Sequence, residues 1–315
     1  MRKVLLSLAL SLSAIITFAQ QDPQFTQNMF IKLPVNPGYA GTTGALCATL
    51  VYRNQWVGFS GAPKTFLFCI DKPFIELHGG LGLTIANDQL GNFNFMHARL
   101  AYSYHKPVGA TGLVGVGLEA GILQSTVKNN WLAPDGTTGQ TDDAIPDQGI
   151  SKMTYDIGLG AYYRTDQLYV GLSASHVPGG AEHLTAPSFN YKAAQHYYVI
   201  AGYDFFLSSK ITLRPSVHIK TDAAVTTFDL NCNVLFDNFV WGGLSYRLQD
   251  AVAAMVGIAW KPNEKSTLKV GYAYDLGTSD LKPYHGGTHE ILVNYCIKIV
   301  RPPKIQSHIN PRFLK

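Results

Sequence analysis

Hydrophobic and polar residues alternate with a period of two through most of the chain, after an opening stretch rich in Pro, Gly and Asn. Between residues 226 and 236, for example, Phe228 and Leu230 alternate with Asp229 and Asn231. Such alternation is typical of β-strands with one apolar and one polar face, because successive side chains of a strand point to opposite sides. The pattern therefore predicts an all-β protein.

About fourteen strands are expected. Most span about 9 to 13 residues, longer than the roughly 5 or 6 of an ordinary strand and suited to a tilted crossing of a bilayer. The expected ranges are 44–53, 64–72, 77–88, 93–106, 112–127, 153–164, 168–176, 195–207, 211–221, 226–236, 239–248, 251–261, 266–275 and 288–299. The pattern predicts a single antiparallel transmembrane β-barrel of the outer-membrane type over residues 44–299. The alternative, a large soluble sandwich, predicts shorter strands and fewer aromatic residues.

The expected connections alternate in length along the chain. The long ones follow odd-numbered strands, and they are residues 54–63, 128–152, 177–194 and 276–287. Outer-membrane barrels place long loops outside the cell and short turns in the periplasm. The alternation therefore predicts that both termini lie in the periplasm.

The composition is that of an exported protein. Only 15% of the 315 residues are charged and 46% are hydrophobic. No internal run reaches the roughly 20 apolar residues of a membrane helix. Residues 1–19 combine a basic start with an apolar stretch, which predicts a secretory signal peptide. The formal charge of +4 is too small to indicate nucleic acid as a partner.

Two segments flank the predicted barrel. Residues 20–43 hold several apolar side chains, so we expect them to enter the lumen or to pack across the periplasmic mouth; a loose linker is the alternative. Residues 300–315 carry four basic residues, three prolines and no acidic residue. This composition favours an extended periplasmic tail that docks on a partner, with basic residues such as Arg312 in an acidic groove and Phe313 and Leu314 as apolar anchors. The alternative is a disordered remnant or a segment folded back on the periplasmic turns.

Candidate chemistry is sparse. Histidines and carboxylates scatter over different strands and loops without a catalytic, cofactor-binding or metal-ligating motif. The sequence therefore predicts a protein that is not an enzyme and holds no cofactor or metal. Cys47 and Cys69 lie on the polar faces of neighbouring predicted strands. A disulfide between them and two unpaired thiols are both compatible with this placement.

The connection of residues 54–63 is the candidate docking loop. Arg53 and Lys64 flank it, and Trp56 lies within it beside two glycines that permit tight turns. The hypothesis is that Trp56 packs over or into the barrel mouth and fixes the loop as a lid or docking surface. The alternative is that Trp56 anchors the barrel at the outer leaflet, as aromatic residues commonly do at a bilayer interface.

Short motifs in a fixed order carry a family resemblance. They read DPQF at 22–25, NPGYAG at 36–41, YRNQW at 52–56, GYAYDL at 271–276, GTHEI at 287–291 and PRFL at 311–314. Together they resemble the PorP/SprF family, outer-membrane barrel proteins of the type IX secretion system of Bacteroidetes. The likeness spans nearly the whole chain after residue 19.

The resemblance implies a non-catalytic role in the secretion of type IX cargo or in the surface anchoring of adhesins of gliding motility. The implied partners are outer-membrane lipid, a cargo or adhesin with a type IX C-terminal domain, and a periplasmic peptidoglycan-binding lipoprotein. A passive porin or hydrophobic-solute transporter is the alternative, and an open conductance in a planar bilayer would distinguish it.

Overall fold

The computed structural model describes residues 22–128, 149–177, 182–186 and 189–299. The predicted signal peptide (1–19) and the basic tail (300–315), with Arg312, Phe313 and Leu314, lie outside these residues. Among the described residues, no helix is long and apolar enough to span a membrane. The helical elements are three-residue turns, η1 (Asn28–Phe30), η2 (Pro37–Tyr39) and η4 (Lys282–Tyr284).

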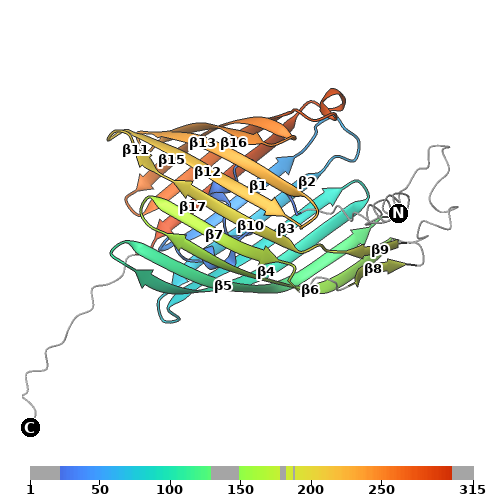
Figure 1. Ribbon diagram of the computed structural model, residues 1–315, viewed down its shortest axis with the longest axis horizontal. Helices are drawn as coiled ribbons and strands as arrows, with labels where there is room; N and C mark the ends of the chain where they lie inside the picture. Colours follow the sequence, from blue (N-terminus) through green and yellow to red (C-terminus); the bar gives the residue numbers. More distant parts are fainter. Residues whose placement is uncertain (1–21, 129–148, 178–181, 187–188, 300–315) are drawn as a thin grey trace, which may run out of the picture.

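Fourteen antiparallel strands close into a barrel (Figure 1). They are β1 (Ala45–Asn54), β2 (Lys64–Phe74), β3 (Gly79–Leu90), β4 (Phe93–Val108), β5 (Gly112–Val127), β6 (Ile150–Arg164), β7 (Leu168–Ser175), β10 (His196–Tyr203), β12 (Ile211–Thr221), β13 (Thr226–Phe236), β14 (Val240–Arg247), β15 (Ala251–Asn263), β16 (Ser266–Gly277) and β17 (Thr288–Lys298). The sheet closes where β1 pairs with β17, from Ala45 opposite Lys298 to Asn54 opposite His289. Closure pairs the strand edges that lipid would leave unsatisfied, and it confirms the predicted barrel.

Three minor strands complete the sheet structure. The strands β8 (Glu182–Ala186) and β9 (Phe189–Lys192) pair with each other between β7 and β10, and β11 (Phe205–Phe206) pairs with β12. The predicted strand 195–207 is therefore interrupted at Asp204. The reason is that Asp204 donates its backbone N–H to Gln167 of the preceding turn (2.8 Å), and its side chain pairs with Arg214 (3.0 Å). The other strands agree with their predicted ranges to within a few residues.

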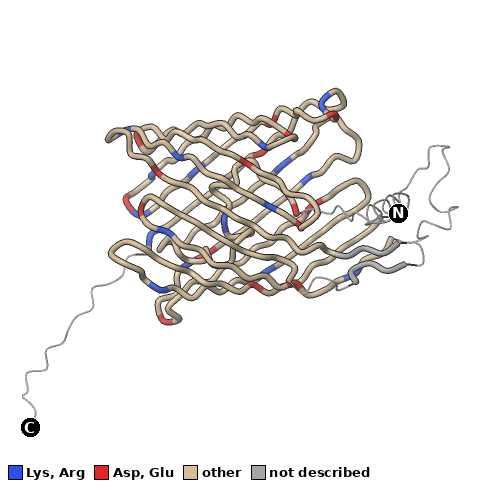
Figure 2. Tube along the Cα trace, in the orientation of Figure 1, with Lys and Arg blue, Asp and Glu red and all other residues tan. Residues whose placement is uncertain are grey.

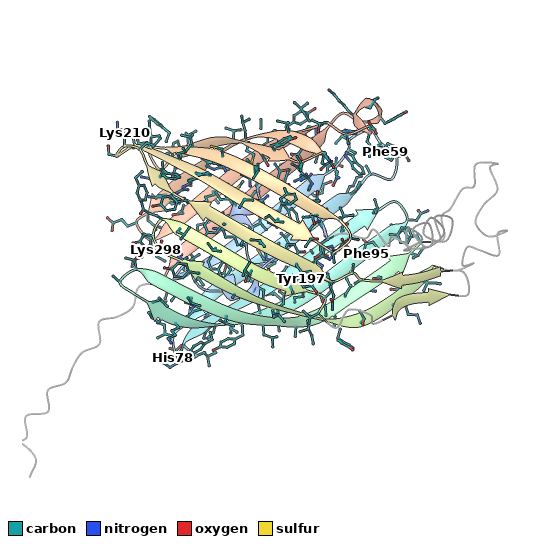
Figure 3. The ribbon with its side chains drawn as sticks, viewed as in Figure 1. Phe59, His78, Phe95, Tyr197, Lys210 and Lys298 are labelled. Atoms are coloured by element: carbon teal, nitrogen blue, oxygen red, sulfur yellow. A yellow bond between two sulfur atoms is a disulfide. The ribbon has the colours of Figure 1, made fainter. Side chains whose placement is uncertain are left out.

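The two faces of the barrel follow the predicted alternation. Along β13, Asp229 and Asn231 are buried toward the lumen, whereas Phe228 and Leu230 point outward and are exposed. Figure 3 shows the outward side chains around the barrel wall. Charged residues of both signs are interspersed along the strands and at both ends (Figure 2). A wet or networked lumen inside an apolar wall is typical of an outer-membrane barrel.

The two ends of the barrel differ in the length of their connections. We define the long-loop end as the end at which β1, β5, β7 and β16 finish, since the longest connections follow these strands. The short-turn end is the end that holds residues 75–78, 109–111, 165–167, 204–210, 237–239 and 264–265. In Figure 3, Phe59 marks the first end, and His78, Lys210 and Lys298 mark the second. The long connections therefore gather at one end, as the sequence predicted.

Residues 22–43, which we call the lumenal segment, run through the inside of the barrel. At the long-loop end, the backbone carbonyl of Asp22 accepts a hydrogen bond from Lys220 (2.7 Å), and at the short-turn end the carbonyl of Thr42 accepts one from Arg164 (3.2 Å). Asp22 and Lys298 consequently lie at opposite ends. The lumenal segment therefore adds one crossing of the barrel that a count of strands does not include. The prediction that both termini lie in the periplasm concerns residues outside the described part of the chain and stays a prediction.

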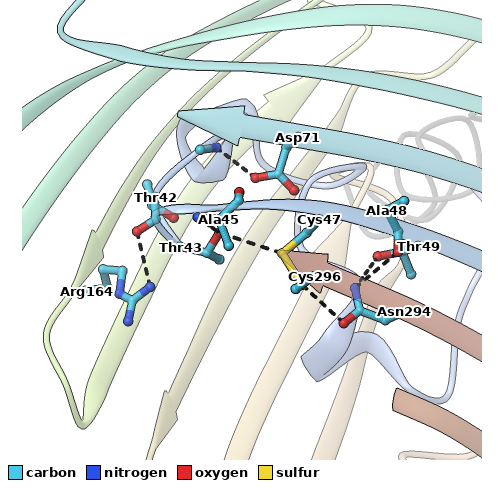
Figure 4. Close-up of a disulfide and its surroundings, with 11 residues drawn as sticks. Thr42, Thr43, Ala45, Cys47, Ala48, Thr49, Asp71, Arg164, Asn294 and Cys296 are labelled. Carbon is cyan, nitrogen blue, oxygen red and sulfur yellow. Dashed lines mark hydrogen bonds between the residues drawn. A yellow bond between two sulfur atoms is a disulfide. The ribbon is translucent and has the colours of Figure 1, made fainter. Parts of the chain in front are cut away.

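A disulfide joins Cys47 to Cys296 across the closure between β1 and β17 (Figure 4). The two residues are directly opposite in the strand register, with their Cα atoms 4.1 Å apart. The prediction of a disulfide between Cys47 and Cys69 is therefore wrong, and so is the alternative prediction that both thiols are unpaired. Cys69 is a buried free thiol, because the register of β1 and β2 places it opposite Thr49 and places Asp71 opposite Cys47.

Candidate functional site

Apolar side chains of the lumenal segment pack against the barrel wall. Ile31 is buried against Val51, Leu67 and Leu292 from β1, β2 and β17. Three strands further around the barrel from β17, the ring of Phe30 lies 4.8 Å from the ring of Trp241 on β14. These contacts give the segment small hydrophobic cores of its own inside an otherwise polar lumen.

The middle of the lumenal segment lies directly on the backbone of the wall. A Cβ atom added at Gly117 of β5 would stand 2.4 Å from the carbonyl carbon of Pro37, so only glycine permits this approach. Asn36 caps the turn η2 by accepting a hydrogen bond from the N–H of Gly38 (2.9 Å), and it donates to the carbonyl of Ala161 on β6 (3.0 Å). The turn is therefore fixed to the backbone of the wall by the Asn36 side chain and by the close approach at Gly117.

Buried ion pairs hold the segment near the long-loop end. Arg53 of β1 reaches Asp275 of β16 at 2.8 Å and Glu290 of β17 at 2.9 Å, and all three side chains are at most 3% exposed. Glu290 also accepts hydrogen bonds from the backbone N–H groups of Thr26 and Gln27, both at 2.8 Å. We call Arg53, Asp275 and Glu290 the mouth ion cluster. It ties the lumenal segment to both sides of the barrel closure.

A second buried ion pair, further around the barrel wall, also binds the lumenal segment. Arg247 of β14 binds Asp229 of β13 at 2.8 Å, and the free carboxylate oxygen of Asp229 accepts a hydrogen bond from Asn28 (3.1 Å). Asn28 in turn accepts one from Asn231 (3.1 Å). Removing one partner of such a buried pair leaves an uncompensated charge, which is strongly destabilising. The lumenal segment is therefore held by charges that water does not reach.

The first described residue, Asp22, lies in a third polar cluster at the same end. One carboxylate oxygen of Asp22 is 3.0 Å from Nε2 of His176, and the other accepts a hydrogen bond from the hydroxyl of Tyr198. Nδ1 of His176 is 2.9 Å from Asp156 of β6. The backbone N–H of Asp22 donates to Nε2 of His196 (3.3 Å). These residues come from four parts of the chain that no sequence motif connects.

A cavity of about 300 Å³ remains at the short-turn end of the lumen. Among its lining residues are Lys32, Lys269, Arg164, Arg214, Tyr39, Tyr162, Tyr169, Cys47 and Cys296. Nζ of Lys32 lies 3.4 Å from the centre of the Tyr169 ring, and Nζ of Lys269 lies 5.4 Å from that of Phe30. No carboxylate of a described residue is within ion-pair distance of either lysine. The cavity is also lined by Asp71, Asp166 and Asp204, so its wall carries charges of both signs.

The structure separates the predicted docking residues of the 54–63 loop. Arg53 is 2% exposed inside the lumen, so it belongs to the mouth ion cluster and not to an external surface. Trp56 is half-buried with a φ of 49°, and its backbone N–H donates a hydrogen bond to the hydroxyl of Thr288 (3.1 Å). Its neighbour Val57 exchanges backbone hydrogen bonds with residues 286 and 287 at 2.7 and 2.8 Å. Lys64 is exposed at the start of β2.

The Trp56 loop and the connection before β17 therefore form one joined surface. The Trp56 ring lies 6.2 Å from the ring of His285, and Phe59 is 45% exposed at the tip of the loop. The main chain of Gly61 accepts a hydrogen bond from Gly91 of the next connection (2.9 Å). The surface extends over three neighbouring connections of the long-loop end, and we call it the loop platform.

Motif residues that are distant in the sequence converge on the lumen. Arg53 comes from YRNQW, Asp275 from GYAYDL and Glu290 from GTHEI, and Asp22 belongs to DPQF. The sequence pattern assigned Arg53 to the docking loop and the other three residues to family motifs, and the ion pairs between them were not predicted. A usable signal was present, because Arg53, Asp275 and Glu290 all fall on the polar register of their strands.

Fold and lumen together define an outer-membrane β-barrel whose interior is occupied by its own N-terminal segment. The family model of the type IX secretion system membrane protein PorP/SprF matches residues 17–295. The chain therefore belongs to the PorP/SprF family. Among curated proteins, none matches the chain significantly.

Solved structures resemble the chain in fold alone. The CymD monoaromatic hydrocarbon channel is 10% identical and has a TM-score of 0.48, over 88% of this chain and 94% of that protein. The toluene transporter TodX of P. putida is 8% identical with a TM-score of 0.48, over 85% and 93%. A FadL homologue of Pseudomonas aeruginosa is 9% identical with a TM-score of 0.44, over 81% and 89%.

Proposed function

We propose that the protein is a closed outer-membrane scaffold of the type IX secretion system, which supports the secretion or surface anchoring of a cargo protein without conducting solutes itself. The observation that carries this proposal is the lumenal segment, which fills the barrel and is held by the buried mouth ion cluster. Membership of the PorP/SprF family links the protein to the type IX secretion system. The chain then acts through its surfaces and not through a pore.

The long-loop end is proposed to face the cell exterior, since outer-membrane barrels carry their long loops outside. The loop platform would then meet the secreted cargo or adhesin. Trp56 and Phe59 offer aromatic surface, and Lys64 adds a positive charge. Aromatic side chains on a hydrogen-bonded, well-fixed loop are common energetic centres of protein interfaces.

The short-turn end is proposed to face the periplasm and to dock a peptidoglycan-binding lipoprotein. The basic tail, with Arg312, Phe313 and Leu314, would follow β17 on this side. The four basic residues of the tail favour an acidic partner segment, because charge complementarity speeds association and selects the partner.

The scaffold is tested by conductance. Purified wild-type protein reconstituted in a planar bilayer should show no steady open conductance, because the lumenal segment occupies the lumen. An outer-membrane porin reconstituted in the same way serves as the positive control. A stable open channel in the wild-type protein would favour the porin alternative and contradict the scaffold.

The two proposed surfaces are tested against each other. Trp56→Ala should reduce the cargo on the cell surface at least severalfold and leave co-purification of the periplasmic lipoprotein unchanged. Deletion of residues 307–315 should instead abolish co-purification of the periplasmic lipoprotein and leave the amount of cargo on the cell surface unchanged. Each variant is the folding control of the other, provided that both shift in mobility on heating, as a folded barrel does. If the two variants lose the same partner, the assignment of the surfaces is wrong.

A further inference from the structure

We infer that Asp22, His176 and His196 form a zinc site at the long-loop end, which fastens the start of the lumenal segment to the barrel wall. Each residue offers one ligand atom, and the three atoms lie within 4.8 Å of one another. The inference rests on geometry and does not depend on the proposed secretion role.

The ligand types and their distances fit zinc. Imidazole nitrogen and carboxylate oxygen bind Zn²⁺ at about 2.0–2.2 Å, which places neighbouring ligand atoms of a tetrahedral site about 3.3 Å apart. Nε2 of His176 is already 3.0 Å from the carboxylate of Asp22. Nε2 of His196 lies within 4.8 Å of the other two ligand atoms, and to bind zinc it would have to move closer and give up the hydrogen bond from the backbone N–H of Asp22. Three protein ligands leave a fourth position for water.

The outer contacts of both histidines are those of metal ligands. Nδ1 of His176 is 2.9 Å from the carboxylate of Asp156, and Nδ1 of His196 is 3.0 Å from the carbonyl oxygen of Ala194. Metal-bound histidines generally donate this second N–H to a carboxylate or a backbone carbonyl, which fixes the tautomer and the direction of the ring. Both Nε2 atoms are thereby directed toward Asp22.

Backbone geometry and charge are also consistent with a cation. His176 follows β7 with a φ of 55°, a left-handed conformation that side chains rarely adopt and that often marks a functional position. Asp22 and Asp156 place carboxylates on both ring nitrogens of His176. The nearby amine of Lys220 binds the backbone carbonyl of Asp22 and not its carboxylate, of which one oxygen faces His176 and the other accepts a hydrogen bond from Tyr198. Zinc would replace the proton between His176 and Asp22.

The site is tested by zinc titration of the full-length protein, purified in detergent with a tag that contains no histidine and stripped with a chelator. Calorimetry should detect one tightly bound Zn²⁺ per barrel. His196→Gln should weaken binding by about 100-fold or more, and Asp156→Asn by about 10- to 100-fold, the usual effect of an outer contact. His105→Gln, at the other end of the lumen, is the matched control and should bind zinc normally.

A second measurement separates metal binding from folding. His196→Gln keeps both carboxylate contacts of His176, so it should show the heat-modifiable mobility of a folded barrel. Zinc should raise the temperature of that mobility shift in the wild-type protein and in His105→Gln, but not in His196→Gln. If the wild-type protein binds no zinc, or if His196→Gln binds it with unchanged affinity, the site does not exist. Neither outcome would alter the conductance test of the scaffold.

Discussion

Arg53→Met is expected to release the long-loop end of the lumenal segment and to lower the stability of the barrel by about 3 kcal/mol or more. The substitution leaves Glu290 and Asp275 buried without their cation, and breaking a buried ion pair typically costs about 3–5 kcal/mol. Arg247 remains 3.8 Å from Asp275, which favours the lower part of that range. The measurement is the denaturant concentration at which heat-modifiable mobility is lost, together with conductance in a planar bilayer.

Arg214→Met provides the matched control. Arg214 also pairs with a carboxylate, at 3.0 Å from Asp204, but its side chain is 33% exposed and that of Asp204 is 26% exposed. A solvent-screened pair of this kind contributes about 1 kcal/mol or less. Intermittent channel openings are expected in Arg53→Met and not in Arg214→Met. Equal stability and equal conductance in the two variants would show that the mouth ion cluster does not retain the lumenal segment.

Replacing both Cys47 and Cys296 with serine is expected to lower the stability of the barrel by about 2–4 kcal/mol, the usual contribution of a native disulfide. This disulfide connects the first strand to the last, so it restricts nearly the whole unfolded chain. The measurement is the same loss of heat-modifiable mobility, with and without a reductant. Reductant should destabilise the wild-type protein and leave the double variant unchanged.

Cys232→Ala is the control for the loss of sulfur itself. Cys232 is an exposed free thiol on β13, on the same lipid-facing register as Phe228 and Leu230, and takes part in no disulfide. Alanine brings no polar group to that face, so this replacement should leave stability within about 0.5 kcal/mol. If the wild-type protein and the Cys47/Cys296 double variant unfold together under oxidising conditions, the disulfide contributes nothing to the closed barrel.

The strands could be predicted from the sequence because their information is local. Alternation in residues 226–236 assigns Asp229 to the lumen and Phe228 to the lipid without reference to any other strand. Turn residues and strand lengths then give the number of strands and the side of each connection. Asp204 is the exception, because its bond to Gln167 depends on the neighbouring turn.

The lumen could not be predicted because its contacts join residues far apart in the chain. Thr26 and Glu290, for example, are separated by 264 positions and meet only after β1 and β17 have paired. The same closure selects Cys296 over Cys69 as the partner of Cys47. Irregular segments have no period to reveal their path. The apolar side chains of residues 20–43 predicted a place in the lumen or across its mouth, but the path of residues 22–43 from the long-loop end to the short-turn end emerged only from the structure.

The course of the lumenal segment also constrains the order of assembly. A segment that crosses the lumen must either be threaded through a finished cylinder or be present while the sheet curls around it. Wrapping requires no passage through a narrow opening, and it lets Ile31 and Phe30 offer apolar surface to strands that are still arriving. The edges of β1 and β17 would then meet last, with the segment enclosed behind them. Pairing of β1 with β17 places Cys47 and Cys296 directly opposite each other, so their disulfide fixes the closed barrel covalently at the point where the sheet meets itself.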